Sequence, residues 1–302
     1  MLLRRLGRQQ EAVAVYWTCL VRDIGADTVR EAMPHAVARA LLPDGQRRGQ
    51  SNDKPSGVTG EDAACNQASE KDGVAVVCVK WGAKYRPEYV NKLYNSVARH
   101  CGELRLTFVC LTDSSDGVEL HENMHVLPLI DGWKGWWNKC QLFSCEVSSK
   151  LRALGNSRCL YVDLDTVVVG SLVDLLVWSP PIGVLALLKT DGMANEQREG
   201  GYNSSIMAWR VDGDIAALQF LYSFLHSHFG SVTKYIYKFD HWLEMAHPEA
   251  CFLEDTFPGQ IVEYRSLDEK AATPPPNATV VCFPLLPKPH GATAVWLARH
   301  WV

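Results

Sequence analysis

The pattern of apolar residues predicts that the main domain begins at about residue 74. Residues 74–79 are a continuous apolar run, typical of a strand buried on both faces of a sheet. Pro87 then opens a segment in which apolar residues recur at helical spacing, and Gly102 ends it. Residues 106–111 form a second apolar run. The order strand, helix, strand predicts a parallel sheet with a right-handed crossover.

The same alternation continues along the chain. A short strand is expected near Val126, an amphipathic helix over residues 137–154, and a further strand around residues 159–163. We therefore predict an α/β fold of the Rossmann-like kind, with a mixed, mostly parallel sheet flanked by helices. In such sheets, ligands bind beyond the carboxyl ends of the strands.

Two zones precede this domain, which we assign to residues 73–302. Residues 1–42 predict a helical extension, and residues 43–72, which are almost free of apolar residues, predict a flexible linker. Residues 12–21 form an apolar run behind three arginines, as in a secretory signal. Charged residues flank the run on both sides and no small-residue cleavage site follows, so we interpret it as a short amphipathic helix.

Composition and charge exclude some function classes. The formal net charge of −4 provides no basic field for nucleic acid or acidic membranes, and no apolar run reaches the roughly 20 residues of a membrane span. The 10 cysteines contain no C-x-x-C pair, and several lie in strand-like runs. They predict reduced, structural thiols and a cytoplasmic location.

The candidate chemistry lies in the segment Val162-Asp163-Leu164-Asp165-Thr166, where two carboxylates follow a buried strand. Three interpretations stay open on these residues alone. The pair could hold a divalent metal against a nucleotide-sugar diphosphate. It could also be the nucleophile and acid of a haloacid-dehalogenase-like phosphatase, or two surface acids in a turn. The phosphatase motif should open the first strand of its domain, but here it lies about 90 residues further on.

A series of short motifs favours the first interpretation. Together they resemble the GT-A glycosyltransferases, of the glycogenin and bacterial galactosyltransferase-like group, from Val74 to about His290. The motifs are Val77-Cys78-Val79-Lys80-Trp81-Gly82-Ala83-Lys84-Tyr85, Phe108-Val109-Cys110-Leu111-Thr112-Asp113, Gly135-Trp136-Trp137-Asn138-Lys139, Leu160-Tyr161-Val162-Asp163-Leu164-Asp165, Gly201-Tyr202-Asn203-Ser204-Ser205, Phe239-Asp240-His241-Trp242 and Pro287-Lys288-Pro289-His290.

The resemblance implies a role for each matched position. Asp163 and Asp165 would hold Mn²⁺ or Mg²⁺, and Asp163 would also contact the donor. Asn203, Asp240 and Lys288 would serve catalysis on the sugar side. The implied donor-binding residues, besides Asp163, are Lys80, Trp81, Gly82, Tyr85, Asp113 and Lys139.

The chain departs from the family at the third metal ligand. Relatives carry a histidine where this chain has Pro284, and a proline cannot coordinate a metal. His290 is the candidate replacement. The resemblance thus implies a metal-assisted transferase that uses a nucleoside-diphosphate sugar, most simply a UDP-sugar, with retention of configuration. The acceptor is a carbohydrate, a lipid or a protein. The alternative is a catalytically impaired nucleotide-sugar-binding protein.

Overall fold

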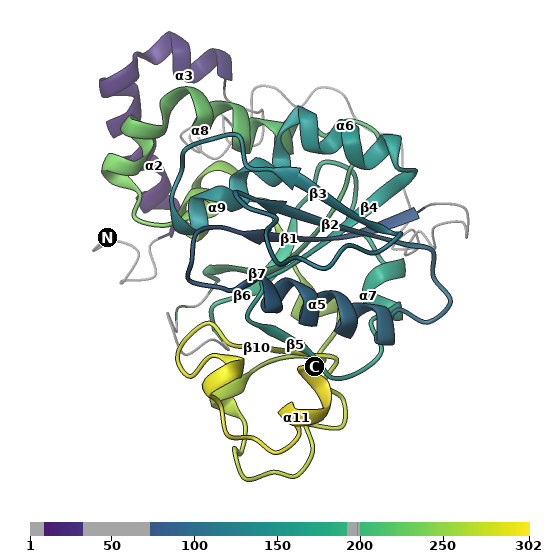
Figure 1. The fold of residues 1–302 in the computed structure, drawn as a ribbon. Helices are drawn as coiled ribbons and strands as arrows, with labels where there is room; N and C mark the ends of the chain where they lie inside the picture. The colour runs from purple at the N-terminus through teal and green to yellow at the C-terminus, as the bar shows by residue number, and fades with distance from the viewer. Residues whose placement is uncertain (1–8, 33–72, 192–197, 199) are drawn as a thin grey trace, which may run out of the picture.

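The computed structural model describes residues 9–32, 73–191, 198 and 200–302 (Figure 1). The predicted linker, residues 43–72, lies outside this part of the chain. The helices are α2 (Gln9–Ile24), α3 (Ala26–Ala32), α5 (Pro87–His100), η1 (Gly135–Phe143), α6 (Cys145–Ala153), α7 (Val173–Val177), α8 (Ala216–Tyr235), α9 (Phe239–Ala246), α10 (Leu253–Thr256), η2 (Tyr264–Ser266), η3 (Pro289–Gly291) and α11 (Leu297–His300). The strands are β1 (Gly73–Lys80), β2 (Leu106–Thr112), β3 (Met124–Pro128), β4 (Asn156–Val162), β5 (Thr166–Val168), β6 (Ala186–Lys189), β7 (Tyr202–Arg210), β8 (Cys251–Phe252), β9 (Ile261–Glu263) and β10 (Val280–Cys282).

A seven-stranded sheet with the order β3-β2-β1-β4-β7-β6-β8 forms the centre of the molecule. Its first four strands are parallel, β7 is antiparallel to both of its neighbours, and β8 is parallel to β6. The predicted mixed, mostly parallel sheet is therefore confirmed. Because β7 runs the other way, its first residues lie at the edge where β1 and β4 end.

Alternate residues of β1 supply two separate cores. Ala75 and Val77 belong to the core on one face, while Val74, Val76 and Cys78 belong to the core on the other. Helix α5 covers the second face, and α6, α8 and α9 lie on the first (Figure 1). The continuous apolar run in the sequence thus reflects a strand with helices on both sides.

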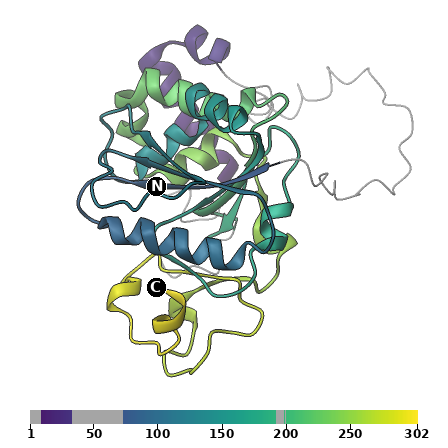
Figure 2. The ribbon, with the colours of Figure 1, turned by 45° about the vertical axis from the view of Figure 1, so that its right-hand side comes forward.

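A second sheet, β5-β10-β9, lies beside the main one near the C-terminus (Figure 2). Strand β4 ends at Val162 and β5 begins at Thr166, so the segment between them joins the two sheets. The Asp163 amide donates to the Ser205 carbonyl at 2.9 Å, and the Asp165 carbonyl accepts from the Phe283 amide at 3.1 Å. Backbone bonds on both sides thus hold the two-aspartate segment in place.

The N-terminal helix α2 packs on the main domain. Its Trp17 is 1% exposed and donates from Nε1 to the Met245 carbonyl at 3.2 Å. The Trp17 ring lies 5.6 Å from Phe224 and 6.4 Å from Trp242, measured between centroids. The predicted amphipathic helix is present, and its apolar face completes the core over α8 and α9.

The helix expected over residues 137–154 is two elements. A 3-10 helix, η1, ends at Phe143, and α6 begins at Cys145. Ser144 between them has an extended backbone (ψ 154°), and its Oγ accepts from the Val147 amide at 3.2 Å. The prediction of one continuous helix was wrong because Ser144 caps a new helix in the middle of the apolar pattern.

No helix in the described part of the chain is long and apolar enough to cross a membrane. The nine cysteines that the structure describes are all free thiols.

His247 predicts a loss of stability in acid. Its side chain is buried, and its Nε2 accepts from the Leu185 amide at 3.1 Å. Burial lowers the pKa of His247 to about 4, whereas a histidine in the unfolded chain keeps a pKa of about 6.5. The unfolded state therefore binds the proton first as the pH falls. The free energy of unfolding should fall by about 3 kcal/mol between about pH 6.5 and pH 4 through this group.

Urea unfolding across this range measures the effect, with His247→Gln as the matched variant. The glutamine amide oxygen can accept from Leu185 but does not titrate. The variant should lose this share of the pH dependence. If its free energy of unfolding instead varies with pH as in the native protein, groups other than His247 cause the dependence.

Candidate active site

A cavity of about 400 Å³ opens where β1 and β4 end and β7 begins. It lies at the sheet edge where the sequence places the candidate residues. Predicted residues that line it are Trp81, Tyr85, Lys139, Asp163, Asp165, Asn203, Asp240 and Lys288. The other lining residues are Val79, Lys84, Gly135, Trp136, Tyr161, Leu164, Ser204, Ser205, Lys238 and Pro284.

The Asp163 carboxylate pairs with Lys139. The Lys139 ammonium lies 2.8 Å from Asp163 Oδ1 and also donates to the Ser204 carbonyl at 3.1 Å. The Tyr161 hydroxyl donates to Asp163 Oδ1 at 2.5 Å. Burial raises the pKa of Asp163, and the Lys139 charge partly offsets that rise. The η1 helix thus places a cation beside a carboxylate whose charge is costly to bury.

Asp165 pairs with a second lysine in the same way. Lys288 donates to Asp165 Oδ2 at 2.6 Å and to the Phe283 and Pro284 carbonyls at 2.6 and 3.1 Å. The Tyr85 hydroxyl donates to the same carboxylate oxygen at 2.6 Å. Burial and the Asp165 charge raise the pKa of Tyr85, so its hydroxyl remains a hydrogen-bond donor at neutral pH.

The start of β7 supplies the opposite wall. Asn203 is buried, and its Oδ1 accepts from the Ser205 amide at 2.9 Å. Asp240 Oδ1 accepts from the Ser204 amide at 3.1 Å and from its hydroxyl at 2.5 Å. Lys238 lies 3.3 Å from Asp240 Oδ2. Asp240 therefore links α9 to the strand that faces Asp163.

Gly201 permits the chain to enter β7 at this point. A Cβ atom there would lie 2.3 Å from Thr190 Oγ1 and 2.7 Å from Arg198 Nη2. Real Cβ atoms do not approach other atoms this closely, so any other residue here would require the Thr190 and Arg198 side chains to move.

Three of the predicted donor-binding residues lie at the same sheet edge but do not line the cavity. Lys80 is buried, and its Nζ lies 3.5 Å from the Ser114 carbonyl. Asp113 Oδ2 accepts from the Gly82 amide at 2.9 Å. In this structure, these residues join the loop after β1 to the loop after β2.

His290, the candidate third metal ligand, is not among the residues that line the cavity. Its Nδ1 forms a hydrogen bond with the Tyr89 hydroxyl, and its side chain does not line the cavity. Among the residues that the structure describes, no group of three or more His, Cys, Asp and Glu is placed to hold a metal ion. The structure therefore does not place His290 as a third ligand in the cavity that holds Asp163 and Asp165.

Ten lining residues were not among the predicted site residues, and among them Tyr161 and Lys238 contact a predicted aspartate through a polar side chain. Tyr161 stands two positions before Asp163 on β4, and side chains two apart on a strand share a face, so the spacing could have identified it. Lys238 directly precedes α9 and lies 3.3 Å from the Asp240 carboxylate two residues further on, so its place beside a predicted site residue could have identified it too.

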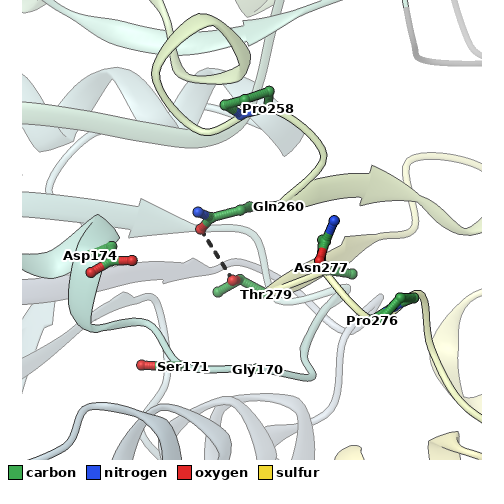
Figure 3. A pocket seen from close by; sticks show the side chains of 9 residues that line it. Gly170, Ser171, Asp174, Pro258, Gln260, Pro276, Asn277 and Thr279 are labelled. Atoms are coloured by element: carbon green, nitrogen blue, oxygen red, sulfur yellow. Dashed lines mark hydrogen bonds between the residues drawn. The ribbon is translucent and has the colours of Figure 1, made fainter.

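A second cavity, of about 310 Å³, lies beside the small sheet (Figure 3). Its wall combines Ser171 and Asp174 with Gln260, Asn277 and Thr279. Thr279 Oγ1 and Gln260 Oε1 are 3.2 Å apart, and among the described residues Asp174 is the only ionisable one that lines it. None of the predicted site residues lies there, so the first cavity is the candidate active site.

Solved structures similar to this chain are glycosyltransferases of the GT-A fold, the group that the sequence motifs resemble. An active-site mutant of LgtC is 15% identical with a TM-score of 0.49, over 74% of this chain and 93% of LgtC. The galactosyltransferase LgtC in complex with donor and acceptor sugar analogues is 14% identical with a TM-score of 0.45, over the same shares of both chains. The apo form of GlyE from Streptococcus pneumoniae is 15% identical with a TM-score of 0.49, over 71% of this chain and 55% of GlyE.

No protein-family model matches the chain, and no curated protein matches it either.

Proposed function

We propose that this chain is a metal-assisted glycosyltransferase that moves a sugar from a nucleoside-diphosphate sugar, most simply a UDP-sugar, to an acceptor. The observation that carries the proposal is the pair of contacts Asp163–Lys139 and Asp165–Lys288 in one cavity at the carboxyl edge of the sheet. Retention of the anomeric configuration is the stereochemistry we expect, with proton NMR of the product as its readout.

Lys139 and Lys288 could stabilise the negative charge of the departing diphosphate. Breaking the bond between sugar and phosphate leaves extra negative charge on the phosphate oxygens, and ammonium groups placed there in advance lower the barrier. Lys139 is already held by the Ser204 carbonyl and the Asp163 carboxylate, and Lys288 by two backbone carbonyls and the Asp165 carboxylate. They would contact the diphosphate with little further loss of side-chain freedom.

The two aspartates fit Mn²⁺ or Mg²⁺. Hard cations prefer oxygen ligands, and such sites are often completed by substrate phosphates and water. Asp163 and Asp165 would hold the ion, which would supply Lewis-acid stabilisation of the leaving diphosphate when bound. Because each carboxylate also pairs with a lysine, the ion has to compete for it. We therefore expect weaker metal affinity than at a site with three protein ligands.

The other lining residues fall into two groups, one for the nucleoside of the donor and one for the transferred sugar. Trp81 and Tyr85 follow β1 and would flank the nucleoside, while the phenolic hydroxyl of Tyr85 keeps Asp165 in position. Asn203 and Asp240 lie on the β7 and α9 side and would bind hydroxyl groups of the transferred sugar. The Ser204 contacts orient the Asp240 carboxylate for that task.

One observation favours a second candidate, a protein that binds a nucleotide sugar without transferring the sugar. Both carboxylates of the motif are already neutralised by lysines, and Pro284 lines the cavity where the family resemblance places a metal-binding histidine. Such a protein would bind the donor but would release no nucleotide on incubation with it.

A thermal-shift screen tests the proposal and its rival together. UDP, UDP-glucose and UDP-galactose are added with and without Mn²⁺, because a ligand that binds the folded state raises the melting temperature. At about 100-fold excess over Kd we expect a rise of roughly 5 °C or more. Mn²⁺ alone should have little effect and should act mainly together with the nucleotide.

Nucleotide release from the same UDP-sugars then separates the two candidates. Release, even to water as acceptor, supports the transferase, while binding without release supports the binding protein. If no nucleotide binds but p-nitrophenyl phosphate is hydrolysed, the phosphatase interpretation of Asp163 replaces both.

We also propose a reducing, cytoplasmic location. Cys78, Cys110, Cys159 and Cys282 are buried in strands as free thiols, and the other described cysteines are free as well. Free thiols in this number are typical of proteins that remain in a reducing compartment.

A further inference from the structure

Trp136 and Tyr237 form an exposed pair of aromatic rings beside the candidate active site. Trp136 lines the cavity and lies on η1, three residues before Lys139. Tyr237 lies between α8 and α9 and directly precedes Lys238, another lining residue. The η1 helix and the connection between α8 and α9 each carry a lysine of the site, and they also place these two rings at its edge.

The exposure of Trp136 is unusual within this molecule. All ten tryptophans lie in the described part of the chain, and Trp136 is the most exposed of them, at 45%. Its neighbour Trp137 is buried and packs its ring against Phe229 at 5.7 Å. Tyr237 is 65% exposed. Large aromatic surface left in water beside a cavity is typical of a binding site.

The rings are arranged to receive a flat apolar face. Their centroids are 5.8 Å apart and their planes meet at 58°, so each keeps ring surface that the other does not cover. One face of a pyranose presents several C–H groups, which pack well on an aromatic ring, while its hydroxyls remain free for polar partners. Lys238 and Asp240 lie next to the pair and offer such partners.

We propose that Trp136 and Tyr237 form the acceptor subsite and that the acceptor is a carbohydrate whose pyranose ring stacks on them. This inference rests on the proposed transferase function and specifies its acceptor class. The nucleoside, in contrast, would lie at the end of β1 beside Trp81 and Tyr85, which also line the cavity. A lipid acceptor would call for a wider apolar surface than two tilted rings, and a protein acceptor is an outcome of the test below.

The test separates sugar binding from nucleotide binding. Saturation-transfer NMR measures the binding of lactose, maltose and cellobiose to the native protein and to the variants Trp136→Ala and Tyr237→Ala. Calorimetry measures UDP binding, with Mn²⁺ present, to the same proteins. We expect at least one disaccharide to bind, and its affinity to fall roughly tenfold in Trp136→Ala, with the Kd for UDP unchanged.

Two control variants define the ring contribution. Tyr237→Phe keeps the ring and should bind sugar as the native protein does. Leu120→Ala removes an even more exposed apolar side chain, 72% exposed, that does not line the cavity, so it should have no effect. Unchanged melting temperatures of all variants would show that they remain folded.

Three results would overturn the inference. The first is sugar binding that is unaffected in Trp136→Ala. The second is weaker UDP binding by that variant, which would assign the rings to the nucleobase. The third is no disaccharide binding by the native protein, which would favour a protein acceptor. Failure of the proposed function looks different, because the native protein would then bind no UDP whether or not it bound sugar.

Discussion

Replacing Asp163 by asparagine is expected to lower nucleotide release from a UDP-sugar by roughly 10²–10³-fold. Asparagine has nearly the same shape, so the change removes charge and leaves volume unchanged. It takes away one of the two carboxylates that would hold the cation, and it leaves Lys139 without its ionic partner. Asp165→Asn should cost a similar factor, because Lys288 would lose its carboxylate in the same way.

The Asp163→Asn variant should lose activity without losing stability. Burial raises the pKa of Asp163, which means that the folded protein holds this carboxylate at a cost in free energy. Lys139 keeps the Ser204 carbonyl and hydroxyl as acceptors after the change. We therefore expect a melting temperature close to that of the native protein together with a large loss of rate.

The control for this experiment is Glu103→Gln, the same chemical change at an exposed residue just before β2, at the opposite end of the strands. It should behave as the native protein. Native-like nucleotide release from Asp163→Asn and from Asp165→Asn would remove both carboxylates from the mechanism.

Replacing Trp17 by alanine is expected to lower the free energy of unfolding by about 3–5 kcal/mol. Its ring contacts Phe224 and Trp242, and its Nε1 satisfies the Met245 carbonyl. The substitution would leave a cavity between α2, α8 and α9 that the smaller side chain cannot fill. Urea unfolding followed by circular dichroism measures the change.

Val15→Ala is the matched control on the same helix. Val15 is 49% exposed, so its truncation should change the free energy of unfolding by no more than about 0.5 kcal/mol. Equal unfolding midpoints for Trp17→Ala and the native protein would mean that α2 does not dock in solution. Because Trp242 and Met245 lie on α9 with Asp240, the nucleotide affinity of Trp17→Ala would also show whether α2 stabilises the site.

Much of the fold could be predicted from local sequence because the spacing of apolar residues and the residues at element ends identify most helices and strands. Strand β1 reads as a continuous apolar run, and α5 begins at the expected Pro87. The helix over residues 137–154 could not be divided in the same way. A serine inside an amphipathic pattern is tolerated by a helix or caps a new one, and only the backbone at Ser144 shows which of these occurs.

The site is predictable to the extent that strand ends meet at one edge of the sheet. Asp163, Asp165 and Asn203 line one cavity because β4 and β7 are antiparallel neighbours, and the end of one lies beside the start of the other. Lys80 and Asp113 also lie at strand ends, yet their side chains do not line the cavity. Position along a strand places a residue at the edge but does not say which face its side chain takes once the strand has ended.

The sequence by itself determined the α/β class, the order of the first strands and the two carboxylates, because these depend on short-range patterns of apolar and charged residues. Only the tertiary structure decided which cations face those carboxylates. Lys139 and Lys288 come from segments far apart in the chain. Lys139 reaches Asp163 because η1 packs against the sheet edge, and Lys288 reaches Asp165 from the loop between β10 and η3. The energy of such ion pairs depends on distance and burial, which are properties of the folded chain.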